Sequence, residues 1–306
     1  MKREINRRNF LKSSMTISVV TAAAMSIKDV KSYSQTKIKR VGGPSIKISC
    51  NAYSYNNYLR KGEMTLDDLF ELCAELGFDA VDPTGYYFPN YPGVPDDEYI
   101  YHIKRKAFLL GLDISGTGVR NDFTNPDKSE RKADVELVKS WMECASKLGA
   151  PVIRIFGGRS IQGGYTEEEV TEWVVEGIKE CADYGKKCGV IAAIQNHNEF
   201  FKTADQLLKV LRMVDSDWVG LMVDTGSFRS AEPYEEIAKA APYAVTWQIK
   251  EIVTFQGREE KINLNKIVNI LRNVGYRGYI PIEHVGEGDP KIVVPRFLRE
   301  VREALS

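Results

Sequence analysis

Nine polar residues of this sequence stand at or just beyond the ends of short apolar stretches, and their types could move protons or hold a cation. They are Asp82, Arg154, Gln195, His197, Asp224, Gln248, Lys250, Glu283 and His284. Carboxylate and amide oxygens bind hard divalent cations, and carboxylates and imidazoles exchange protons. A single residue of this kind can simply mark the end of a strand. Charged groups from several strand ends would stay unpaired unless they met a metal or a polar ligand, so the set predicts an active or binding site.

The apolar stretches alternate with amphipathic helices that carry their own start and stop signals. The first helix begins after Thr65, with Asp68 three residues further on as a capping box, and it ends at Gly77. The sequence predicts strands near 46–52, 78–83, 112–118, 151–156, 190–196, 218–224, 244–250 and 279–283. It predicts helices near 65–76, 97–110, 130–148, 166–187, 203–214, 233–240, 263–273 and 290–303.

Eight strand–helix units in about 260 residues predict an α/β fold, a single-domain (β/α)₈ TIM barrel over residues 46–306. In this fold, polar residues at the C-terminal ends of the strands meet at one face of the barrel. A doubly wound open sheet is the alternative, but it usually carries a Gly-rich phosphate-binding turn after its first strand. Here the first strand runs into Asn51–Tyr55, which is no such turn.

Several segments of the barrel resemble the xylose isomerase-like TIM barrel superfamily, which comprises sugar isomerases and epimerases and endonucleases of the AP endonuclease family 2 type. The resemblance covers the chain from about residue 46 to the C-terminus. It is carried by Ile48–Ser54, Ala74–Asp79, Val152–Gly158, Ala193–His197, Val223–Gly226, Gln248–Glu251 and Ile282–Glu283. It implies a carbohydrate as the small-molecule substrate.

The resemblance also implies a divalent metal, Mn²⁺, Mg²⁺ or Co²⁺, held by four residues from the fifth to the eighth strand. Carried over residue by residue, these ligands are Gln195, Asp224, Gln248 and Glu283. Gln195 stands where a Glu is common, and Gln248 where a His is common. Amide oxygens can bind Mg²⁺, Mn²⁺ or Ca²⁺, but two carboxylates in place of three should weaken binding. Loss of the metal is the alternative.

The chemistry implied by the resemblance is removal of a proton next to a carbonyl group. In the relatives, Glu residues of the fifth and eighth strands act as a pair, and Gln195 cannot take up a proton. We therefore expect Glu283 to be the base and His197 its partner, with Glu199 as a second choice. One base suits a 1,2-isomerisation, and equally a β-elimination or hydration of a 3-keto-glycoside.

Substrate binding is expected from polar residues at the barrel mouth and from one aromatic loop. Arg154, His197 and Lys250 are the predicted contacts to sugar oxygens or a carboxylate. The loop 86–92 (YYFPNYP) is expected either to stack on a sugar ring or to close over the barrel. His102 lies within a predicted helix and is expected to be structural.

Two other classes of protein fit the sequence less well. A DNA-repair endonuclease of the superfamily needs many histidines for its zinc ions, and this chain has only His102, His197 and His284. The second class is a non-catalytic carbohydrate-binding barrel whose metal site has decayed, which would agree with Gln195 and Gln248. Retained metal or turnover of keto-sugars would separate an enzyme from such a protein.

The first part of the chain resembles an export signal. Asn6–Lys12 has the paired arginines and the Phe-Leu-Lys of a twin-arginine signal, which predicts a signal segment over 1–27, a polar linker over 28–45 and a periplasmic location. No apolar stretch is long enough to span a bilayer. The five cysteines show no disulfide or zinc-ligand spacing, and Cys73 and Cys181 fall on apolar helix faces, where we expect them buried.

The formal net charge of zero hides a strong asymmetry. Residues 1–40 contain ten Lys and Arg against two acidic residues, which leaves 32 basic and 40 acidic residues in the body. An acidic body is a poor partner for nucleic acid, because phosphate binding requires a basic surface. Barrels of the resembled family often form dimers, so a homodimer stays open.

Overall fold

A computed structural model describes residues 37–197 and 199–306. The predicted signal segment, residues 1–27, lies outside the described residues. The described chain contacts the barrel from Ile38 onwards, whose backbone N–H donates to the carbonyl of Pro242 at 3.0 Å. Arg40 Nη2 donates to the carbonyl of Ala244 at 2.7 Å, next to the ring of Tyr276.

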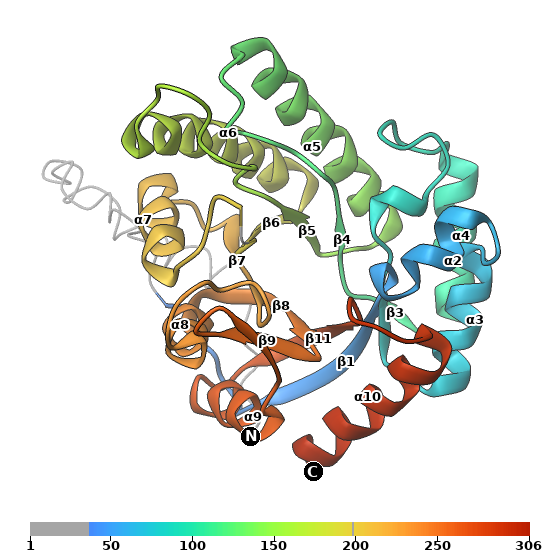
Figure 1. The fold of residues 1–306 in the computed structure, drawn as a ribbon. Helices are drawn as coiled ribbons and strands as arrows, with labels where there is room; N and C mark the ends of the chain where they lie inside the picture. Colours follow the sequence, from blue (N-terminus) through green and yellow to red (C-terminus); the bar gives the residue numbers. More distant parts are fainter. Residues whose placement is uncertain (1–36, 198) are drawn as a thin grey trace, which may run out of the picture. The chain divides into compact units, whose positions relative to one another are not determined.

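A parallel β-barrel forms the centre of the described chain (Figure 1). Its strands are β1 (Ser45–Asn51), β2 (Ala80–Asp82), β3 (Asp113–Ile114), β4 (Thr117–Gly118), β5 (Val152–Ile155), β6 (Ile191–Gln195), β7 (Val219–Asp224), β8 (Ala244–Lys250) and β11 (Arg277–Glu283). They pair in the order β3-β2-β1-β11-β8-β7-β6-β5-β4. Because β3 and β4 are two halves of one strand, separated only by Ser115 and Gly116, the nine segments make the eight strands of a TIM barrel, as predicted.

Helices surround the barrel on its outside (Figure 1). They are α3 (Leu66–Leu76), α4 (Asp97–Leu109), α5 (Lys128–Leu148), α6 (Glu167–Cys188), α7 (Ala204–Val214), α8 (Pro233–Ala240), α9 (Leu264–Asn273) and α10 (Pro290–Leu305). Each follows a strand in sequence, which is the connection that a parallel sheet requires. Within the described residues, no helix is long and apolar enough to span a membrane.

The predicted helix boundaries are confirmed by cap contacts. Both halves of the capping box are present at Thr65–Asp68, Thr166–Glu169 and Thr203–Gln206. Gly77 ends α3 in the left-handed conformation, at φ 77°, where a side chain would be strained. Cys73 and Cys181 are fully buried on the inner faces of their helices, as expected. An N-cap of this kind stabilises its helix by about 1 kcal/mol.

Two segments that the apolar periodicity does not predict lie in loops at the C-terminal end of the barrel. After β1, the chain forms the short helices η1 (Ala52–Tyr55) and α2 (Asn56–Lys61). After β8, it forms an antiparallel hairpin of β9 (Ile252–Phe255) and β10 (Arg258–Lys261). All four residues of β10 are exposed, so this strand has no apolar face that a sequence pattern could show.

The interior of the barrel is layered, and this layering positions the functional side chains. Val152, Ala193 and Met222, from β5, β6 and β7, form a small buried cluster separate from the main core. Side chains two residues apart on a strand point to the same side. Arg154, Gln195 and Asp224 stand two residues further along these strands, so they form the next layer towards the C-terminal end.

Candidate active site

A cavity of about 730 Å³ opens at the C-terminal end of the barrel. Its wall includes seven of the nine polar residues named from the sequence: Arg154, Gln195, His197, Gln248, Lys250, Glu283 and His284. Asp224 and Asp82 do not reach the wall and are almost wholly buried, with exposed fractions of 0% and 3%. Among the described residues of the wall, Glu283 is the only carboxylic acid.

Lys250 contacts both carboxylates, Asp224 and Glu283, that the family resemblance implies as metal ligands. Its ammonium donates to Asp224 Oδ2 at 2.7 Å and lies 3.4 Å from Glu283 Oε2. Burial lowers the pKa of Lys250, but the two carboxylates outweigh burial and leave this pKa raised. The lysine is therefore a fixed positive charge at the floor of the cavity.

The carboxylate of Asp224 is fully engaged by donors of the chain itself. Besides Lys250, Oδ2 accepts from Gln195 Nε2 at 2.7 Å and from Ser227 Oγ at 2.8 Å. Oδ1 accepts from the backbone N–H of Gly226 at 2.9 Å. Asn196 holds the backbone of Asp224 from the other side, accepting from its N–H and donating to its carbonyl, both at 2.8 Å.

This arrangement does not fit the divalent-metal site that the family resemblance implies. Gln195 turns its amide nitrogen, a donor, towards Asp224, whereas a metal would need the amide oxygen. Lys250 places a cation between Asp224 and Glu283, where the metal would bind. In the part of the chain that the structure describes, no three His, Cys, Asp or Glu side chains form a cluster suited to a metal ion.

Glu283, at the end of β11, has the environment of a general base. It is 4% exposed, and burial raises its pKa above the ordinary value, while Lys250 opposes that shift and Asp224 adds to it. A carboxylate whose pKa is raised towards neutrality takes up a proton more readily than an ordinary one. The amide of Gln248 is close enough to favour its charged form.

Arg154 is buried in an aromatic setting at the cavity wall. Its guanidinium lies 4.3 Å from the centre of the Phe156 ring, and Nη1 donates to Tyr86 Oη at 3.1 Å and to the carbonyl of Val119. Among the described residues, no carboxylate lies within ion-pair distance of it. Gly118 makes room for the guanidinium, since a Cβ there would lie 2.8 Å from Arg154 Nε.

Asp82, below the cavity, has the most clearly shifted pKa of the buried acids. Burial raises this pKa to about 7, Glu283 adds to the shift and the charge of Arg154 opposes it. A carboxyl group whose folded-state pKa lies above its unfolded value stabilises the fold at low pH and loses that contribution as pH rises through the folded pKa. The window here runs from about pH 4 to about pH 7.

We expect Asp82→Asn to flatten the pH dependence of stability in this window. The free energy of unfolding of the wild type should fall from pH 4 to pH 7 by up to a few kcal/mol through Asp82, because one pKa unit corresponds to about 1.4 kcal/mol. Urea denaturation at a series of pH values measures this slope. Asp68→Asn is the control, because the pKa of this exposed capping residue is lowered and its contribution changes below the window. An unchanged slope in Asp82→Asn would contradict the assignment.

His197 lines the cavity, but its expected alternative, Glu199, is engaged elsewhere. The ring of His197 packs edge-on against Phe156, at 5.0 Å between ring centres, and burial lowers its pKa. Its Nδ1 lies 3.4 Å from Glu199 Oε2, yet it has no aligned hydrogen bond to any described residue. Glu199 binds Arg120 Nη2 through both oxygens, at 2.8 and 2.6 Å, and does not line the cavity.

His284 and His102 differ in their surroundings. His284 lines the cavity, and its Nδ1 bonds Glu251 Oε2 at 2.5 Å, a pairing that no sequence pattern predicts. Glu251 also pairs with Arg296 from α10. His102 lies on α4, as expected, where it pairs with Asp67 at the surface.

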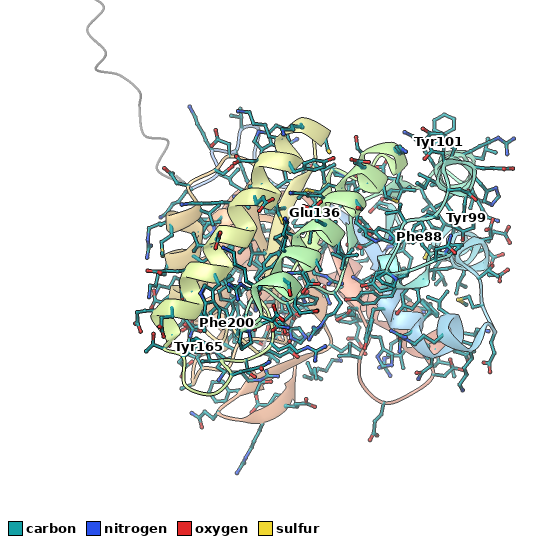
Figure 2. All side chains as sticks on the ribbon, turned by 90° about the horizontal axis from the view of Figure 1, so that it is seen from above. Phe88, Tyr99, Tyr101, Glu136, Tyr165 and Phe200 are labelled. Carbon is teal, nitrogen blue, oxygen red and sulfur yellow. The ribbon has the colours of Figure 1, made fainter. Side chains whose placement is uncertain are left out.

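The aromatic loop 86–92 serves the cavity and the core at once. Tyr86 and Tyr91 line the cavity. Phe88 is buried against Trp141, with ring centres 5.5 Å apart. Figure 2 shows Phe88 beside Tyr99 near α4, and the two ring centres are 6.0 Å apart. The buried Phe88 therefore anchors a loop whose Tyr86 and Tyr91 face the cavity.

Together, the barrel and the cavity at its C-terminal end define a TIM barrel protein with a polar site in the usual position for this fold. The sequence of residues 70–301 matches the family described as xylose isomerase-like TIM barrel, and the chain belongs to this family. A sequence search of curated proteins finds no match.

Solved structures with the same fold include several sugar epimerases. D-psicose 3-epimerase from Clostridium cellulolyticum H10, solved with D-tagatose, is 20% identical, with a TM-score of 0.71 over 85% of this chain and 99% of that one. The 3-keto-D-glucoside 4-epimerase from E. coli is 13% identical, with a TM-score of 0.66 over 85% and 99%. A xylose isomerase-like TIM barrel protein from Mycobacterium smegmatis, in complex with magnesium, is 19% identical, with a TM-score of 0.64 over 85% and 98%.

Proposed function

We propose that the protein is a sugar isomerase or epimerase that removes a proton next to a carbonyl group of a carbohydrate. The observation that carries the proposal is the position of Glu283. Among the described residues of the cavity wall it is the only carboxylic acid, its pKa is raised, and a buried ammonium lies 3.4 Å from it. A base beside a fixed cation is the arrangement that proton removal next to a carbonyl requires, because negative charge develops on the oxygen.

The other residues of the wall have roles that follow from their chemistry. Glu283 takes the proton from carbon, and His197, kept neutral by its lowered pKa, can exchange a proton with the substrate. Arg154 has no carboxylate partner among the described residues and is free to bind a sugar oxygen or a carboxylate of the substrate. Tyr86, which lines the wall, offers an aromatic ring on which a sugar can stack.

The resident divalent metal is not part of this proposal. The similar Mycobacterium smegmatis protein was solved with magnesium, and the family resemblance implies Mn²⁺ or Mg²⁺ at Gln195, Asp224, Gln248 and Glu283. In this chain the position between Asp224 and Glu283 is filled by Lys250.

Exchange of substrate hydrogen with solvent tests the proposed function. A panel of ketoses and 3-keto-glycosides is incubated with the purified protein in D₂O and followed by NMR. We expect deuterium at the carbon next to the carbonyl, together with an isomer or epimer of at least one sugar. Saturable binding of sugars without exchange would favour a non-catalytic carbohydrate-binding barrel. The absence of both binding and exchange would refute the proposal.

A lyase or hydratase acting on 3-keto-glycosides is the second candidate. It is favoured by the single carboxylic acid in the described wall, since elimination needs one base only. Glu283 would take the proton next to the carbonyl, and a C=C bond would form as the bond from the neighbouring carbon to the glycosidic oxygen broke. Glu283 would then pass its proton to that oxygen, which would leave as an alcohol. The same NMR experiment separates the two, because elimination releases the alcohol whereas isomerisation keeps the glycoside intact.

We also propose that the protein is exported to the periplasm by the twin-arginine route. The support is Asn6–Lys12 in the sequence, ahead of an apolar stretch. Cell fractionation of the full chain, with Arg7 and Arg8 both replaced by Lys as the comparison, tests the proposal. Equal periplasmic amounts of both forms would contradict it.

A further inference from the structure

The ammonium of Lys250 lies near two carboxylates, those of Asp224 at the end of β7 and Glu283 at the end of β11. It lies 2.7 Å from Asp224 Oδ2 and 3.4 Å from Glu283 Oε2, and also donates to Ser227 Oγ at 3.3 Å. Only 12% of the lysine side chain is exposed, and that part faces the cavity. The cation is therefore built into the site and is in a position to meet a bound substrate.

The turn after β7 is shaped to hold this lysine. A Cβ at Gly226 would lie 2.7 Å from Lys250 Cδ and 3.1 Å from the carbonyl of Ile252, so only glycine leaves room for the lysine stem. The hydroxyl of Thr225 accepts from the backbone N–H of Lys250 at 3.0 Å. Asp224, Thr225, Gly226 and Ser227 thus each contribute to the placement of one side chain.

The remaining donors leave Asp224 little capacity for a metal. Its two oxygens accept from four groups of the chain, including Gln195 Nε2 and the N–H of Gly226. Two carboxylates with one ammonium have a net charge of −1, which attracts a divalent ion less than two free carboxylates do. A metal could bind only after displacing a buried, hydrogen-bonded lysine.

We propose that Lys250 replaces the divalent metal, so that the site works with a cation supplied by the chain. This inference rests on the proposed function. Glu283 takes a proton from the carbon next to the carbonyl, the electron pair of the broken C–H bond forms the C=C bond of an enediolate, and the carbonyl oxygen becomes negative. The ammonium of Lys250 stabilises that oxygen. Glu283 then returns the proton to a carbon of the enediolate, and in an isomerisation His197 relays the hydroxyl proton from one enediolate oxygen to the other, so the reaction needs no co-reactant.

The proposal is tested with Mn²⁺ and with a lysine variant. Wild type, Lys250→Ala and Lys239→Ala are treated with EDTA, incubated with MnCl₂ and desalted, and bound manganese is measured by mass spectrometry. Lys239 is the matched control, because it is a surface lysine of α8 paired with Asp205. We expect substoichiometric manganese in the wild type and the control, unchanged melting temperatures with Mn²⁺, and full turnover after EDTA treatment.

Lys250→Ala should lower turnover about 10²- to 10³-fold, which is the usual loss when one protein group that stabilises an oxyanion is removed. Added ethylammonium should restore part of it in this variant and have no effect on Lys239→Ala. One manganese per wild-type chain, lost with turnover on EDTA treatment, would overturn the replacement and leave the proposed function standing. Absence of any sugar turnover would refute the proposed function, while the manganese content of the wild type would still decide whether Lys250 excludes the metal.

Discussion

Replacing Glu283 with Gln is expected to lower turnover by about 10²- to 10⁴-fold, the range attributed to a general base. The amide has nearly the same shape as the carboxylate but cannot accept a proton. Because Glu283 is 4% exposed and its charged form is disfavoured by burial, its neutralisation should change the free energy of unfolding by no more than about 1 kcal/mol. The change should therefore act on kcat and leave the fold intact.

Steady-state kinetics on the sugar identified by deuterium exchange measures this effect, with urea denaturation as the check on folding. Glu303→Gln, an exposed residue of α10, is the matched control and should leave both quantities unchanged. Turnover in Glu283→Gln at the wild-type rate, in a folded protein, would remove Glu283 from the mechanism. Of the two proposed proton-exchanging groups, His197 would then remain as the candidate base.

Replacing Asp224 with Ala is expected to lower the free energy of unfolding by about 3–5 kcal/mol, the range for breaking a buried ion pair. Asp224 is 0% exposed, and its loss leaves Lys250 with only a 3.4 Å contact to a carboxylate. It also removes the acceptor of Gln195, Ser227 and the N–H of Gly226. Unpaired buried donors add to the cost of the unpaired charge.

Urea denaturation in EDTA measures the Asp224→Ala effect without any contribution from a bound ion. Asp205→Ala is the control, because this exposed residue pairs with Lys239 at the surface and should cost less than about 1 kcal/mol. In the Asp224→Ala background, Lys250→Met should regain part of the loss, since it removes the uncompensated charge. A stability equal to that of the wild type would show that the Asp224–Lys250 pair does not hold the site together.

The barrel could be predicted closely because its helices and strands carry local signals. The predicted strand 244–250 and helix 233–240 have the observed bounds, and the capping boxes fix several other helix ends. The predicted strand 112–118 is interrupted at Ser115 and Gly116, which leaves β3 and β4 as separate pieces. The charged hairpin β9–β10 and the short helix α2 could not be predicted, because neither has an apolar period.

The gathering of these polar residues could be predicted from their order in the chain, because the C-terminal ends of parallel strands in a barrel meet at one face. That order does not determine their partners. The three-dimensional packing sets these partners: Lys250 contacts both Asp224 and Glu283, Glu199 binds Arg120, and Arg154 lies against Phe156. Such pairings depend on strand register, on the space left at Gly226 and Gly118, and on the direction of each side chain. All three depend on how segments far apart in the chain pack against one another, which the order of residue types does not specify.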